Sequence, residues 1–137
     1  MKKISFDFDN TLDRVEIQNF AKELKNKEFE IWIVTSRQSE FKDEWLRTLA
    51  HFENKDLFKV AEEIGIERDN VIFTNHKPKA EFFLNNSDFI FHLDDDWMEL
   101  SIINSETKVK GISCWRNTSW KRKCNKLIKD YEKHSQN

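Results

Sequence analysis

Short apolar runs alternate with helix-periodic segments along this chain, a pattern typical of α/β proteins. Strands are predicted where apolar runs are bounded by charged or turn-forming residues, over residues 3–8, 29–35, 70–74, 89–93 and 109–114. Helices are predicted where apolar residues recur every three or four positions, around residues 15–24, 41–52, 57–64, 79–84, 100–103 and 120–133. Because the two patterns alternate, we expect a three-layer, Rossmann-like α/β fold with a mostly parallel central sheet and helices on both faces.

Two residues mark expected helix boundaries. Gly65 is the expected C-cap of the helix over 57–64, because glycine readily adopts the left-handed conformation that ends many helices. Pro78 is expected at the first helical position ahead of Lys79, where its missing N–H costs nothing. No internal repeat and no low-complexity linker interrupts the pattern, so a single domain over residues 1–137 is expected.

Composition narrows the class of protein. The hydrophobic fraction is only 38%, but 12 Phe and 5 Trp supply large side chains for a core. No apolar run reaches the ~18 residues of a membrane span, and no signal peptide precedes the first predicted strand. We therefore expect a cytoplasmic protein with no membrane partner. Cys114 and Cys124 lack the spacing of a zinc site or a disulfide framework, and are expected to be ordinary thiols.

Two carboxylates stand at the end of the first predicted strand. Alternation along a strand predicts that Asp7 and Asp9 point the same way, while Phe6 and Phe8 pack on the other side. Acids just past the carboxyl end of a strand would lie in the crevice where open α/β sheets bind ligands. Taken alone, the pair also suits a solvated turn or a calcium-binding loop.

Polar residues also mark the second strand and the helix before the fourth. Thr35 closes its strand, where its hydroxyl, like that of Ser36, could cap the segment that follows. Two lysines, Lys77 and Lys79, stand at the head of the helix predicted over 79–84. Lys79 is favoured as the site residue, because Lys77 precedes a proline and is expected to be extended and exposed.

Three consecutive acids, Asp94, Asp95 and Asp96, follow the fourth predicted strand. They would repel one another unless a cation lay nearby. In chain order, Asp-x-Asp, Thr, Lys and Asp-Asp resemble the four motifs of the haloacid dehalogenase (HAD)-like superfamily of phosphohydrolases, over residues 5–96. Response-regulator receiver domains use similar residue types, but in them the acidic pair comes first and the lysine last. Here the acidic cluster comes after the lysine.

The resemblance implies a magnesium-dependent phosphatase that hydrolyses phosphomonoesters through an aspartyl-phosphate intermediate. Asp7 would be the nucleophile, Asp9 the general acid and base, and Thr35 and Lys79 would contact the transferring phosphoryl group. The implied Mg²⁺ ligands are Asp7, a backbone carbonyl at Asp9, Asp95 and, as support or through water, Asp94. Which of the three consecutive acids binds the metal directly stays open. The candidates for substrate or phosphate contacts are Asn10, Thr11, Ser36 and Arg37.

The substrate is less constrained than the chemistry. Members of this superfamily often carry a cap domain, but the intervals between the motifs here are too short to hold a large one, so an open site is expected. Residues 108–133 carry nine Lys or Arg against two acids, and Trp115 and Trp120 lie among them. Such a segment could guide nucleic acid, or could be a strand and an amphipathic helix with solvated lysines.

Three functions follow from these observations. The leading one is hydrolysis of a small phosphorylated metabolite or nucleotide, and the second is the same chemistry on a nucleic-acid end. The third is a non-catalytic regulatory domain, which the presence of all four motifs disfavours. None of the histidines shows ligand spacing, and His92 is expected to be a satisfied histidine beside the sheet or a residue lining the site.

Overall fold

The central sheet has five strands, all parallel. The computed structural model describes residues 2–39 and 54–135, and the predicted helix over 41–52 therefore lies outside the described residues. The strands are β1 (Lys3–Phe6), β2 (Glu30–Thr35), β3 (Val71–Phe73), β4 (Phe89–Asp94) and β5 (Lys110–Ser113). Their spatial order, β3-β2-β1-β4-β5, confirms the predicted Rossmann-like α/β class.

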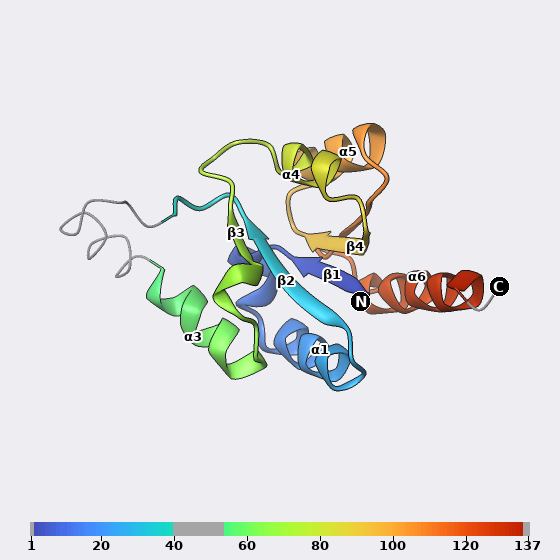
Figure 1. The fold of residues 1–137 in the computed structure, drawn as a ribbon, viewed down its shortest axis with the longest axis horizontal. Coiled ribbons are helices and arrows are strands. Elements are labelled where there is room, and N and C mark those ends of the chain that lie inside the picture. The colour runs from blue at the N-terminus through green and yellow to red at the C-terminus, as the bar shows by residue number, and fades with distance from the viewer. Residues whose placement is uncertain (1, 40–53, 136–137) are drawn as a thin grey trace.

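Helices cover both faces of the sheet (Figure 1). They are α1 (Val15–Asn26), α3 (Lys55–Ile64), α4 (Lys79–Asn85), α5 (Trp97–Glu106) and α6 (Trp120–Ser135). Apolar side chains of α1, α3 and α6 share one buried cluster with Phe6 and Leu93, whereas those of α4 and α5 form a second cluster with Val34 and Phe89. The two clusters are the cores of the two outer layers.

Helix boundaries agree closely with the sequence pattern. Gly65 follows α3 in the left-handed conformation (φ 95°), and its N–H donates to Ala61 O at 2.9 Å, as predicted for a C-cap. Pro78 was predicted at the first helical position. In the structure it directly precedes α4, and Lys79 is the first helical residue. No helix of the described segments has the length and apolarity to cross a membrane.

The strand order determines where a ligand can bind. From β1 the chain builds outward through β2 and β3, then returns to place β4 on the other side of β1. The crevice between the carboxyl ends of β1 and β4 is therefore the switch point at which such sheets bind ligands. Residues 2–39 and 54–135 include no cap domain over this edge, in agreement with the short intervals between the motifs.

Candidate active site

A wide turn after β1 places the first two acids. Asp7 N–H donates to Leu93 O of β4 at 2.9 Å, and Leu12 N–H reaches back to Asp7 O at 3.1 Å. Within the turn Asp9 is extended and Asn10 is left-handed (φ 59°). Asp9 is thus oriented by the turn and not by strand alternation, because β1 already ends at Phe6.

An acidic pocket of about 400 Å³ lies at the switch point. It is lined by Asp7, Asp9, Asn10, Ser36, His76, Lys77, Lys79, Asp94, Asp95, Asp96 and Glu99. These residues come from the carboxyl ends of β1, β2 and β4, the loop before α4 and the first turns of α4 and α5. Parallel strands all end at this edge, so motifs up to about 90 positions apart in sequence meet here.

Lys79 is the cation at the centre of the pocket. Its Nζ donates to Asp7 Oδ1 at 2.9 Å and to Asp94 Oδ2 at 2.5 Å, and its side chain is only 3% exposed. Lys77 also lines the pocket but is exposed. The structure therefore brings Lys79, the favoured candidate, into contact with both acidic motifs.

The acids of the pocket carry more negative charge than Lys79 balances. Burial, and then the neighbouring Asp94, raise the pKa of Asp7 well above its ordinary value. Burial likewise raises the pKa of Asp95. Burial alone would also raise the pKa of Asp94, but the hydrogen bond from His92 and the hydrogen bond and charge of Lys79 hold it below its ordinary value. An additional cation would stabilise the fully ionised state of this cluster.

Three of these carboxylates are close enough to share a metal ion. Ligand oxygens of Asp7, Asp94 and Asp95 all lie within 4.8 Å of one another. A set made only of carboxylate oxygens suits a hard cation such as Mg²⁺. Asp96 is different, because its side chain accepts hydrogen bonds from the Met98 and Glu99 N–H groups and caps α5.

Asp94 is already largely occupied by protein donors. Its Oδ2 accepts from Lys79 and from His92 Nε2 at 2.8 Å, and its Oδ1 accepts from the Asp96 N–H at 3.0 Å. Asp7 and Asp95 both line the pocket, and Asp7 accepts at Oδ1 from Lys79. The three residues could hold a metal ion, with Asp7 and Asp95 as candidates for direct ligands and Asp94 in support.

A buried hydrogen-bonded chain supports the site from behind, and sequence reasoning missed its role. His92 is fully buried and joins Asp94 to Ser5, whose Oγ lies 2.6 Å from His92 Nδ1. Burial lowers the pKa of His92, so the ring is neutral, donates from Nε2 to Asp94 and accepts at Nδ1 from Ser5. His92 thus does not line the pocket, and the signal for its role is its placement two residues before Asp94.

Asp9 is held by Arg37. The guanidinium donates to Asp9 Oδ1 and Oδ2 at 2.7 and 2.9 Å, and also to both oxygens of Asp56 on α3. Its carbon lies 4.9 Å from the centre of the Phe8 ring. Arg37, predicted to contact phosphate or substrate, binds both oxygens of Asp9 and is not among the residues that line the acidic pocket.

The remaining predicted residues divide between the pocket and its support. Ser36 and Asn10 line the pocket. Thr35 is fully buried and its hydroxyl accepts from the Arg37 N–H at 3.2 Å. Thr11 is also fully buried, with its hydroxyl 3.4 Å from Cys114 Sγ, and it is not among the residues that line the pocket.

His76 and Glu99 line the pocket although no sequence pattern indicated them. His76 has a left-handed backbone (φ 67°), and its N–H donates to Ser36 O at 2.8 Å. Glu99 accepts from the Lys79 N–H at 3.2 Å, and burial raises its pKa. The loop before α4 places His76 at the pocket, and the first turn of α5 places Glu99 there. Hydrophobic periodicity does not predict such placements.

No family model and no curated protein sequence matches this chain. The chemistry of the pocket is therefore the basis for inferring function. Its defining contact is a buried lysine between two carboxylates, beside a third carboxylate that faces the pocket.

Proposed function

We propose that this protein is a magnesium-dependent phosphomonoester hydrolase of the HAD-like superfamily that uses Asp7 as its nucleophile. The observation that carries the proposal is the Lys79 ammonium held between Asp7 and Asp94 at the switch point. A carboxylate beside a fixed cation and a potential metal site is the arrangement that phosphoryl transfer requires, because the phosphate dianion otherwise repels an anionic nucleophile.

Asp7, Asp95 and Asp94 would hold the metal, which would supply positive charge against the phosphoryl oxygens. Lys79 adds a second positive charge beside Asp7 Oδ1, and a carboxylate oxygen of Asp7 would attack phosphorus. A bond forms from this oxygen to phosphorus as the bond from phosphorus to the leaving oxygen breaks. Ser36 and the backbone N–H groups of the turn after β1 are available to contact the non-bridging oxygens.

Asp9 is the proposed general acid and base. It would protonate the leaving oxygen and then accept a proton from the water that hydrolyses the aspartyl phosphate. Both of its oxygens accept one hydrogen bond each from Arg37, which leaves a second lone pair on each oxygen for a proton. Arg37 thereby keeps Asp9 at the pocket edge and directs its carboxylate until a substrate arrives.

Hydrolysis of p-nitrophenyl phosphate tests the proposal. We expect turnover with Mg²⁺, none after chelation, and a loss of several orders of magnitude for Asp7→Asn. Asp69→Asn, at an exposed acid before β3, is the matched control and should behave like wild type. Undiminished hydrolysis by the Asp7 variant, or by wild type without a divalent cation, would contradict the proposal.

A second candidate, a phosphatase for nucleic-acid ends, is favoured by one observation on α6. Its buried face is Trp120, Cys124 and Ile128, and the opposite face carries an exposed row of Arg122, Lys126, Lys129 and Lys133. The row begins near the turn that carries Asp9, because Trp120 at the start of α6 and Asn10 line the same cavity. A polynucleotide whose end lay in the pocket would find phosphate-binding cations along this helix.

A further inference from the structure

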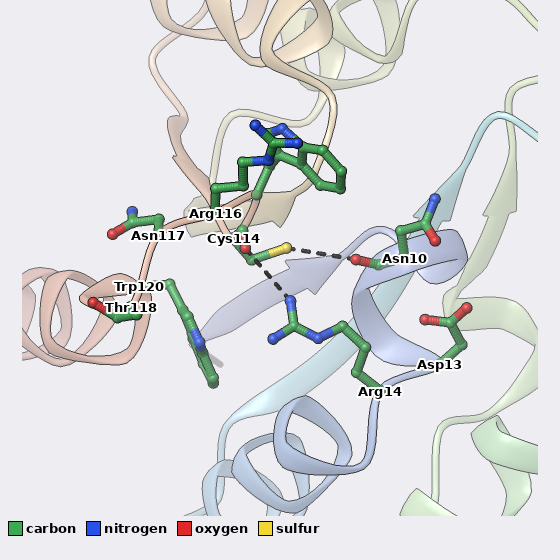
Figure 2. A pocket seen from close by; sticks show the side chains of 9 residues that line it. Asn10, Asp13, Arg14, Cys114, Arg116, Asn117, Thr118 and Trp120 are labelled. Carbon is green, nitrogen blue, oxygen red and sulfur yellow. Dashed lines mark hydrogen bonds between the residues drawn. The ribbon is translucent and has the colours of Figure 1, made fainter.

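A second cavity, of about 770 Å³, opens beside the acidic pocket, and Asn10 lines both (Figure 2). It lies between the turn after β1 and the segment that links β5 to α6. The two hollows share Asn10, which directly follows Asp9, the proposed general acid. The volume falls in the range of sites that hold a small organic ligand.

The wall of this cavity is aromatic and cationic. Trp115 lines it with 54% of its surface exposed, and the Arg116 guanidinium lies 5.2 Å from the centre of the Trp115 ring. Arg116 forms no ion pair with any residue that the structure describes. On the other side, Asp13 and the Asn10 amide supply hydrogen-bonding groups (Figure 2).

The protein holds this wall in place. The backbone N–H of Trp115 donates to Ser113 Oγ at 3.2 Å, and the side-chain amide of Asn117 donates to Ser113 O at 2.9 Å. Cys114 contacts Asn10 O through its sulfur at 3.7 Å and accepts at its carbonyl from Arg14 at 3.4 Å, the two contacts drawn in Figure 2. These bonds attach the segment to the turn that carries Asp9.

Arg116 itself has a left-handed backbone (φ 48°), a conformation that disfavours a side chain other than glycine or asparagine. Such strain persists where the surrounding structure imposes it, often at ligand sites. Here the strained backbone is that of Arg116, whose guanidinium lies at the cavity wall. A large exposed aromatic ring and an unpaired cation beside an active site call for a ligand that is itself planar, π-rich and anionic.

We propose that this cavity binds the nucleoside part of a nucleotide whose phosphate lies in the acidic pocket, with the nucleobase stacked on Trp115 and polar contacts from Arg116. The inference rests on the proposed function, because it identifies the leaving group of that reaction. In an in-line displacement the leaving oxygen lies across phosphorus from Asp7, beside Asp9, and the group bonded to it extends past Asn10. A sugar phosphate without a base would leave Trp115 uncovered.

Two sources can supply this nucleotide unit, a free mononucleotide or the terminal nucleotide of an oligonucleotide. Kinetics with uridine 5′-monophosphate and ribose 5-phosphate isolate the base, because both are 5′-phosphomonoesters of ribose. We expect Trp115→Ala to raise KM for the nucleotide about tenfold, the size of one lost stacking contact, with little change in kcat. The same variant should leave KM for ribose 5-phosphate unchanged.

Trp97→Ala is the matched control, because Trp97 is 70% exposed beside Asp96 on the α5 side of the acidic pocket but lines neither hollow. A rise in KM for the nucleotide with Trp97→Ala and not with Trp115→Ala would overturn the inference, as would equal kcat/KM for the two esters in wild type. A terminal nucleotide is the source if a 5′-phosphorylated oligouridine shows the same dependence on Trp115 at lower KM.

Equilibrium binding separates the inference from the proposed function. Uridine 5′-monophosphate is titrated calorimetrically into Asp7→Asn and into the double variant Asp7→Asn, Trp115→Ala. Binding that weakens about tenfold in the double variant supports the nucleoside site, whether or not any ester is hydrolysed. If the binding weakens in this way and no ester is hydrolysed, only the phosphatase proposal is rejected. Hydrolysis of both esters with no effect of Trp115 would reject the nucleoside site alone.

Discussion

Asp7 is buried at a cost to the folded state, and that cost is tied to its chemistry. A nucleophilic carboxylate must be ionised, yet burial and Asp94 raise its pKa well above the ordinary value. The cluster therefore binds a proton or a cation more tightly than separate acids would. If Asp7 is the nucleophile, as proposed, its function and the stability of the metal-free protein are opposed, as at many active sites.

Asp7→Asn should stabilise the metal-free protein. An acid with a raised pKa in the folded state contributes stability that is present below its unfolded pKa and is lost as pH rises through the folded value. Asparagine has no such charge, so at pH 8 the variant should gain on the order of 1 kcal/mol in the free energy of unfolding, and less at pH 5. Denaturant unfolding with a chelator present measures both differences. A variant less stable than wild type at pH 8 would contradict the electrostatic account of the pocket.

Lys79 and Lys77 should differ sharply despite their proximity in sequence. Lys79→Ala removes the cation shared by Asp7 and Asp94, so turnover should fall by roughly 100-fold or more. Lys77→Ala, at an exposed position two residues away, is the matched control and should retain most activity. Circular dichroism with Mg²⁺ present verifies that both variants are folded. The reverse ranking would move the cationic role to Lys77.

At the level of the elements, the end of β4 explains what the sequence could and could not predict. The acidic run after a buried strand predicted the site, and Asp94, Asp95 and Asp96 all line it. Their separate roles depend on the backbone turn between β4 and α5, which hydrophobic periodicity does not encode. Asp94 points back to Lys79 and His92, Asp95 faces the pocket and Asp96 caps α5.

The same limit applies to Asp9. The spacing of Asp9 after the first strand predicted that it belongs to the site. Arg37, which binds Asp9 in the structure, was expected to contact the substrate. Periodicity predicts strands and helices because it reports burial, whereas the Arg37 contacts with Asp9 and Asp56 join three segments far apart in sequence. Pairings of this kind need the fold as well as the pattern.

Asp96 gives a prediction about α5. Asp96→Ala removes two hydrogen bonds to the first turn of the helix and should cost about 1 kcal/mol of stability. Catalysis should change little, because Asp95 and not Asp96 is the proposed metal ligand. Asp95→Asn is the contrasting variant, for which we expect a much weaker dependence of turnover on Mg²⁺. Thermal unfolding and a Mg²⁺ titration of activity measure the two effects, and a loss of Mg²⁺ dependence in Asp96→Ala would contradict the assignment.

Across the whole molecule, charge and topology are arranged around one edge of the sheet. Residues 108–133 carry nine basic and two acidic side chains, although the chain as a whole has a net charge of −2. The acidic motifs gather where the parallel strands end, while the basic row runs along α6. The sequence predicted the parallel sheet because its connections are helical, and the observed order of strands explains why the motifs meet.

Salt dependence tests whether the basic row guides polynucleotides. Hydrolysis of a 5′-phosphorylated oligonucleotide should then slow steeply between 50 and 200 mM salt, since each phosphate contact releases condensed counterions. Hydrolysis of p-nitrophenyl phosphate should change much less over the same range. Lys126→Glu with Lys129→Glu should remove most of the difference between the substrates. Equal salt dependence of the two reactions would reject a guiding role for α6.

The most direct test of the account is to find the phosphoryl group on the protein. Asp9→Asn keeps the Asp7 nucleophile but removes the base that activates water, so the aspartyl phosphate should form from p-nitrophenyl phosphate and hydrolyse slowly. Acid quenching followed by peptide mass spectrometry should locate the phosphoryl group on Asp7, at higher occupancy in Asp9→Asn than in wild type. A phosphoryl group on any other residue, or turnover with no phosphorylated protein in either form, would contradict Asp7 as the nucleophile.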